Sequence, residues 1–299
     1  MANIITTAHL TKSYGGSRGI VDVSFTVEEG EVFGFLGPNG AGKTTTMRVL
    51  MGLLHANAGS ATIGDLDVWA QSTAVKKLIG YLPGELSLDP ALTGAQILAY
   101  LGNLRGGMDQ TYLRQLIDRL GVDPSKRFRE YSRGNKQKIG LIQAFMHRPR
   151  LLILDEPTSG LDPLNQQEFY AMVKEVRADG RTVFLSSHVL PEVEHTCDRV
   201  GIIREGSLVT VDRISAVRDL KRHIVDITFP GDAQVGWFSA IASAHDVAFN
   251  GDQHTIHLTA QGDLSEVIRA AAQHGATNIE AREPSLEEVF LRYYEPTQS

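Results

Sequence analysis

Apolar and polar positions in the first two thirds of the chain follow the patterns of strands and helices. The segment VDVSFTV (21–27) alternates like a half-buried strand, and EVFGFLG (31–37) is a nearly continuous apolar run like a buried parallel strand. Two further apolar runs, LLILD (151–155) and TVFLSS (182–187), flank a helical pattern over 164–180. This order of strand, helix and strand predicts a parallel sheet with right-handed crossovers.

Between about 85 and 150 the hydrophobic periodicity becomes helical. The segments AQILAYLGNLR (95–105), TYLRQLIDRLG (111–121) and KIGLIQAFMHR (138–148) repeat apolar residues at three- and four-residue spacing. We therefore expect a helical subdomain over this range.

After residue 212 the pattern changes again. The expected elements are strands at HIVDITF and HTIHLT, a helix at LSEVIRAAAQHG, a short strand near NIEAR and a last helix at SLEEVFLRYY. Ser285 and Glu288 have the spacing of a capping box for that last helix. We predict a first domain over 1–212 and a small accessory α+β domain over 213–299.

Composition and charge narrow the possible partners. The chain has 299 residues, of which 42% are hydrophobic, and a net charge of −6. An acidic chain argues against nucleic acid as a partner, because nucleic-acid binders usually carry a basic footprint. No segment approaches the roughly 18 apolar residues of a membrane span, and the N-terminus does not read as a secretory signal. A cytosolic protein is expected, which leaves attachment to a membrane protein open.

The segment GPNGAGKT (37–44) matches the phosphate-binding pattern G-x-x-x-x-G-K-[ST], with a strand pattern before it and a helical pattern after it. Its glycines let backbone N–H groups point at phosphate oxygens, and the following helix adds its N-terminal partial positive charge. We expect Lys43 to reach the β- and γ-phosphates and the Thr44 hydroxyl to hold Mg²⁺. The candidate nucleotide-binding residues of this loop are Gly37, Pro38, Asn39, Gly40, Ala41, Gly42, Lys43, Thr44 and Thr45.

A pair of carboxylates follows the apolar run LLILD. Asp155 ends the predicted strand, where open α/β sheets bind their ligands, and we expect it to hold Mg²⁺ directly or through water. Glu156 comes next and is the candidate general base for an attacking water, a role worth about 10²–10⁴ in rate. Together with the glycine-rich loop, this pair predicts a P-loop NTPase.

Six motifs in order resemble those of the ATP-binding subunits of ABC transporters, over residues 4 to about 212. They are KSYGG, GPNGAGKTT, YSRGNKQ, LLILDEP, TSGLDP and TVFLSSH. The resemblance implies that Tyr14 stacks on adenine, although a turn aromatic packed on the sheet is the alternative. It also implies that Asp162 lies at a dimer seam. His188 would hydrogen-bond the γ-phosphate and position the water activated by Glu156.

The resemblance further implies a fold and an assembly. The fold would be an ABC cassette: a P-loop NTPase with a mixed sheet core, an antiparallel β subdomain and a helical subdomain. Two subunits would enclose two ATP molecules head to tail, each closed by the signature helix of the other subunit. Ser132 and Gly134 would be the phosphate contacts of that helix. A homodimer is expected, and a heterodimer stays open.

Two positions depart from the family pattern. The signature usually written LSGGQ is YSRGN (131–135) here, so Arg133 replaces a glycine. Arg133 either points to solvent or adds positive charge to the facing nucleotide, like an arginine finger. In the loop after IGYLP, Gly84 occupies the place of a glutamine and Glu85 follows. Glu85 either replaces that glutamine as a Mg²⁺ ligand or is only an exposed loop charge.

These motifs favour the energising subunit of a membrane exporter, attached at the cytoplasmic face of the membrane through separate permease subunits. The C-terminal segment EPSLEEVFLRYY resembles the tail of bacterial cassettes for drug, antibiotic or lipid export. The alternatives are a soluble ABC ATPase acting on ribosomes or DNA, and an importer subunit. A phosphotransferase or GTPase switch would need neither the signature nor the switch histidine.

Overall fold

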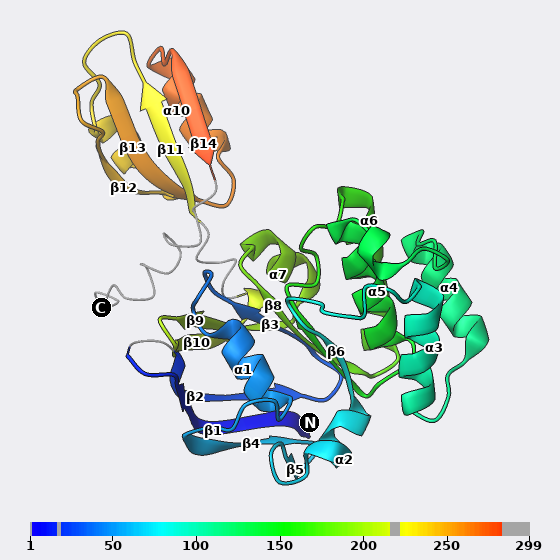
Figure 1. Cartoon of the computed structure of the whole chain (residues 1–299). Coiled ribbons are helices and arrows are strands. Elements are labelled where there is room, and N and C mark those ends of the chain that lie inside the picture. The colour runs from blue at the N-terminus through cyan, green and yellow to red at the C-terminus, as the bar shows by residue number, and fades with distance from the viewer. Residues whose placement is uncertain (1, 17–18, 216–221, 283–299) are drawn as a thin grey trace. The chain divides into compact units, whose positions relative to one another are not determined.

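The computed structural model describes residues 2–16, 19–215 and 222–282. The chain forms two compact units, Met1–Ile214 with two sheets and Ser215–Ser299 with one sheet (Figure 1). The helix expected at SLEEVFLRYY, with its capping box at Ser285 and Glu288, lies outside the described residues.

A six-stranded mixed sheet forms the centre of the first unit. Its strand order is β10-β9-β3-β8-β7-β6. The strands are β3 (Val32–Leu36), β6 (Ile79–Leu82), β7 (Leu151–Asp155), β8 (Thr182–Ser187), β9 (Arg199–Arg204) and β10 (Ser207–Arg213). All neighbours pair in parallel except β10, which is antiparallel to β9. The predicted mixed α/β core is therefore confirmed.

A second sheet of the first unit is antiparallel throughout. Its order is β2-β1-β4-β5. The strands are β1 (Asn3–Ser13), β2 (Gly19–Glu28), β4 (Ala58–Ile63) and β5 (Leu66–Asp67). This sheet is the expected antiparallel β subdomain, and the alternation of VDVSFTV is explained because Val23, Phe25 and Val27 point into the core.

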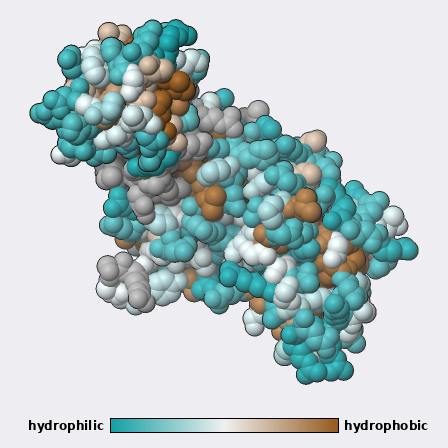
Figure 2. Space-filling view, turned by 90° about the horizontal axis from the view of Figure 1, so that it is seen from above, coloured by the Kyte–Doolittle hydropathy of each residue, from teal (hydrophilic) through white to brown (hydrophobic). Residues whose placement is uncertain are grey.

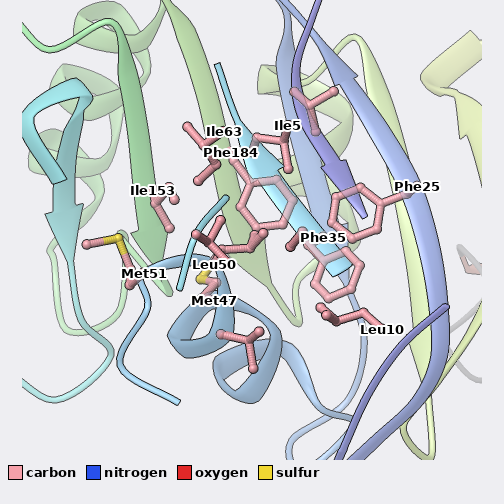
Figure 3. Packing of buried hydrophobic residues seen from close by; sticks show 14 of the residues in the cluster. Ile5, Leu10, Phe25, Phe35, Met47, Leu50, Met51, Ile63, Ile153 and Phe184 are labelled. Atoms are coloured by element: carbon pink, nitrogen blue, oxygen red, sulfur yellow. The ribbon is translucent and has the colours of Figure 1, made fainter. Parts of the chain in front are cut away.

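Helix α1 (Lys43–Leu50) packs against both sheets of the first unit (Figure 1). Phe25, Phe35 and Phe184 gather beside Met47 and Leu50 of this helix (Figure 3), and all five side chains are buried. The ring centroids of Phe25 and Phe184 are 5.7 Å apart, a separation typical of paired aromatic rings. Such dense packing fixes the end of β3 relative to the start of α1, which are the two sides of the P-loop.

The other helices of the first unit frame the remaining motifs. They are α2 (Ser72–Leu78), α3 (Gly94–Leu104), α4 (Gln110–Leu120), the 3₁₀ turn η1 (Phe128–Glu130), α5 (Arg133–Phe145), α6 (Pro163–Ala178) and α7 (Leu190–Thr196). The helices α3, α4 and α5 make the expected helical subdomain. Helix α7 packs on the face of β3 opposite to α1, since Gly34 lies against Val193 and Cys197. Among the described residues, no helix has both the length and the apolar character needed to cross a membrane.

The second unit is an antiparallel sheet with helices on one face. The strand order is β12-β13-β11-β14. The elements are β11 (Arg222–Thr228), α9 (Gly236–Ser239), β12 (Ala244–Phe249), β13 (Thr255–Gln261), α10 (Ser265–Gln273) and β14 (Asn278–Arg282). Val225 and Leu258 of the sheet pack with Phe238 and Val267 of the helices in a separate buried core. Residues 222–282 therefore contain the helices and strands that an α+β appendage requires.

Candidate nucleotide site

The P-loop connects the carboxyl end of β3 to the start of α1. A side chain at Gly37 would lie 2.3 Å from the carbonyl oxygen of Ile203. Gly42 has a φ of 110°, and a side chain there would lie 2.7 Å from Cγ2 of Ile20. Both positions therefore require glycine, for close packing at Gly37 and also for backbone conformation at Gly42.

A cavity of about 820 Å³ opens over this loop. A volume of this size is typical of small-molecule sites. Its lining comprises Tyr14, Gly19, Pro38, Asn39, Gly40, Gly42, Lys43, Thr44, Thr45, Glu156, Glu205 and Gly206. The sequence reasoning missed Gly19, Glu205 and Gly206, which belong to β2 and to the turn between β9 and β10 and carry no motif.

The Lys43 ammonium lies inside the P-loop. It donates to the carbonyl oxygens of Gly37 (2.6 Å) and Pro38 (3.2 Å), and it lies 3.2 Å from Oε1 of Glu156. Its side chain is only 6% exposed. A buried cation beside backbone amides is a strong attractor for phosphate oxygens.

Hydroxyl and carboxylate oxygens converge at the tip of β7. Thr44 donates from Oγ1 to Oδ2 of Asp155 at 2.7 Å, and Ser186 donates from Oγ to Oδ1 at 2.6 Å. The same Ser186 oxygen accepts from the backbone N–H of Glu156. Asp155 is fully buried. These oxygen donors fit a hard divalent cation such as Mg²⁺, which prefers carboxylate and hydroxyl ligands.

The loop after β6 brings Gly84, and not Glu85, against this carboxylate. A Cβ at Gly84 would lie 2.9 Å from Oδ2 of Asp155. Glu85 is exposed and does not border the cavity. Of the two expectations for Glu85, this arrangement agrees with an exposed loop charge.

Glu156 contacts both of the other candidate catalytic residues. Nδ1 of His188 lies 2.8 Å from Oε2 of Glu156, whose other oxygen faces Lys43. Glu156 adopts a φ of 51°, a left-handed conformation that is uncommon for residues other than glycine. Strained backbone of this kind concentrates at functional sites. A carboxylate at the phosphate end of the cavity, oriented by an imidazole, can accept a proton from water.

Tyr14 borders the cavity at its rim. The residue is 52% exposed, and Nζ of Lys12 lies 5.6 Å from its ring centroid. An aromatic packed on the sheet would be buried, so its exposure fits a stacking platform for a base better than the alternative.

The remaining candidates do not border this cavity. Ser132 caps α5 by accepting from the N–H of Asn135 at 3.3 Å, and Asp162 caps α6 by accepting from the N–H of Asn165 at 3.0 Å. Both are exposed, and Gly134 lies in the first turn of α5. A contact from these residues to nucleotide would therefore come from a second subunit, as the resemblance implies.

Two buried residues that support the site were not foreseen. Ser186 orients Asp155, and Gln137 donates from Nε2 to the carbonyl oxygens of Glu156 and Pro157, both at 3.0 Å. In the sequence, Ser186 is a polar residue inside an apolar strand and Gln137 is a polar residue on the buried face of a helix. Such a position indicates a buried hydrogen bond but does not identify the partner.

The sequence matches known proteins along nearly its whole length. Residues 20–159 match a family model described as ABC transporter. The linearmycin resistance ATP-binding protein LnrL of Bacillus subtilis (strain 168) is 32% identical, covering 95% of this chain and 96% of its own. The bacitracin transport ATP-binding protein BcrA of Enterococcus faecalis is 32% identical, covering 98% of this chain and 96% of its own.

Solved structures match about 70% of this chain. The structure of the ATP-binding subunit of an ABC transporter has a TM-score of 0.67 and 27% identity, covering 72% of this chain and 92% of its own. A nucleotide-free ATP-binding cassette from an ABC transporter has a TM-score of 0.61 and 22% identity, covering 71% of this chain and 92% of its own. The second likeness shows the fold alone.

Proposed function

The chain belongs to the ABC transporter family as an ATP-binding ATPase subunit, and we propose that it energises export of antibiotic-like molecules through a separate membrane permease. The observation that carries the proposal is the likeness to LnrL and BcrA, which extends over 95% and 98% of this chain and so includes both units. Those two proteins are named for linearmycin resistance and bacitracin transport. A ribosome- or DNA-directed ATPase has no comparable support.

For the ATPase step we assign roles by geometry. Lys43, held by loop carbonyls, would bind the β- and γ-phosphates of ATP. Glu156 would take a proton from the attacking water while His188 orients its carboxylate. Thr44 and Asp155 would hold Mg²⁺, which neutralises charge on the phosphates when bound. Tyr14 would stack on the adenine ring.

We propose that two subunits form the working unit, with Ser132, Gly134 and Asp162 of one facing the nucleotide of the other. The exposure of Ser132 and Asp162, and the absence of all three residues from the lining of the P-loop cavity, support this arrangement. A homodimer is the simplest form, and a heterodimer would follow the same geometry. We expect the assembly at the cytoplasmic face of the membrane, bound through the permease.

A second cavity offers the permease a docking surface. It measures about 880 Å³ and lies between α2, the end of α3 and the end of α5. Leu101, Leu104, Met108 and Met146 supply its apolar side, and Lys76, Lys77, Arg105 and Arg148 supply positive charge. The lining carboxylate of Asp109 lies 4.0 Å from Arg148, so the lining carries more positive than negative charge. A cytoplasmic permease segment that carries apolar and acidic side chains would complement this surface.

Reconstitution tests the proposed export function. A sensitive bacterial host would receive this chain with its permease, and growth would be measured against linearmycin and bacitracin. We expect resistance with the wild-type chain and loss of resistance with Glu156→Gln. Equal sensitivity in both hosts, with the complex assembled and hydrolysing ATP, would contradict these antibiotics as cargo and leave the ATPase assignment standing.

A further inference from the structure

Arg133 occupies a geometry that neither sequence expectation included. Its Nη2 donates to Oγ of Ser159 in the same chain at 2.8 Å. Its aliphatic stem covers Gly160, because a Cβ built there would lie 3.3–3.5 Å from Cγ, Cδ and Nε of Arg133. The guanidinium is therefore engaged with the loop that follows Glu156.

Two more residues of α5 hold the same loop. A side chain at Gly134 would lie 2.7 Å from the carbonyl oxygen of Gly160, so the helix and the loop are in direct backbone contact. One turn further along, Gln137 donates to the carbonyl oxygens of Glu156 and Pro157. Helix α5 thus contacts this loop at both ends, at Glu156 and Pro157 and again at Gly160.

The opposite side of the loop is held by the segment that carries the switch histidine. Thr158 donates from Oγ1 to Oε1 of Glu192 at 2.5 Å, and Ser187 donates to Oε2 of the same carboxylate at 2.7 Å. His188 directly follows Ser187. The loop 157–160 is consequently contacted on one side by the first turn of α5, which carries the signature residues 132–135 and is called the signature turn below. On the other side it is contacted by the segment that carries His188, the partner of Glu156.

We propose that Arg133 is a positioning residue that ties the signature turn to the loop 157–160 of its own subunit, and this inference rests on the proposed function. Because Ser159 is a neutral acceptor, this hydrogen bond acts by holding the position of the signature turn and not by pairing opposite charges. The backbone N–H groups around Ser132 and Gly134 then face the second subunit in a set orientation. Pre-ordering of a binding surface lowers the entropy lost on association.

The tie and an arginine finger predict different mutational patterns. A finger acts through its charge on the facing nucleotide, so it depends little on Ser159. A tie requires both partners, so Ser159→Ala should have an effect of its own. Arg133→Ala should have an effect at least as large, because it also removes the stem from Gly160. The double variant should lose no more than Arg133→Ala alone.

The experiment uses the full chain in a Glu156→Gln background and measures the ATP-dependent dimer dissociation constant by analytical ultracentrifugation. We expect each single variant and the double variant to raise this constant by about two- to tenfold, the range of one hydrogen bond. Thermal unfolding should be unchanged, because Arg133 and Ser159 are at the surface. Arg129→Ala removes an exposed arginine from the same region and should leave the constant unchanged. Arg133→Lys should raise the dissociation constant almost as much as Arg133→Ala, since the shorter cation lacks the guanidinium fork.

The outcomes separate the inference from its premise. Additive effects, a silent Ser159→Ala, or restoration by Arg133→Lys would contradict the tie and favour the finger. Silence of both variants would mean that Arg133 contributes nothing at the seam. ATP turnover by the Glu156-containing chain is measured in parallel. If that chain neither turns over ATP nor yields an ATP-dependent dimer after Glu156→Gln, the proposed function itself is wrong.

Discussion

At the residue scale, the position of Glu156 between Lys43 and His188 predicts a separation of binding from chemistry. Glu156→Gln keeps the shape of the side chain but removes the proton acceptor. We expect ATP turnover to fall by about 10²–10⁴ while ATP binding persists. Turnover by phosphate release and binding by calorimetry check this. Glu266→Gln, an exposed change in the second unit, is the matched control; an equal loss there would remove the special role of Glu156.

A second residue-scale prediction concerns the metal. Gly84→Ala would place a methyl group 2.9 Å from Oδ2 of Asp155, so the carboxylate must move. We expect the Mg²⁺ concentration for half-maximal turnover to rise several-fold. Glu85→Ala should leave it unchanged, because Glu85 is exposed and does not border the cavity. A rise in the Glu85 variant alone would instead identify Glu85 as the ligand. Magnesium titrations of ATP turnover measure both.

At the element scale, the segment after α5 predicts a dependence of stability on pH. Burial, and secondly the charge of Arg105, lower the pKa of His147 from 6.5 to about 4. Between these pH values His147 binds a proton in the unfolded chain but not in the folded chain. The free energy of unfolding is therefore highest, as far as His147 is concerned, above pH 6.5, and it falls as the pH is lowered toward 4. We expect His147→Gln to flatten the fall of the unfolding free energy over this window. Urea titrations at several pH values measure it, and parallel wild-type and variant curves would contradict it.

Elements could be predicted from the sequence, but the contacts between them could not. The strands, the P-loop and the helices of the first unit were predictable, because their apolar periodicity and glycine spacing are local. The links between elements were not: Ser186 meets Asp155 across neighbouring strands, Gln137 reaches the carbonyl oxygen of Glu156, and Arg133 reaches Ser159. Such partners depend on strand register and helix position, which no local pattern encodes.

At the scale of the whole molecule, two separate cores predict separable parts. The first unit has its own buried cluster around Phe184, and the second has another around Phe238. Among the described residues, those that line the nucleotide cavity all belong to the first unit. We expect a chain ending at Ile214 to bind ATP with unchanged affinity, measured by calorimetry. A tenfold or greater loss would show that the second unit supports the site.

The last prediction concerns an exposed apolar side chain of the first unit. The face in Figure 2 is largely hydrophilic with small hydrophobic patches. Leu104, which lines the second cavity, is 67% exposed. A large exposed apolar side chain on a basic cavity rim is suited to association. Leu104→Glu should therefore weaken co-purification with the permease at least tenfold and leave the turnover of the isolated chain intact. Ile268→Glu places the same charge on an exposed apolar position of the second unit and should leave assembly unchanged. Loss of assembly in both variants, or in neither, would move the permease contact away from α3.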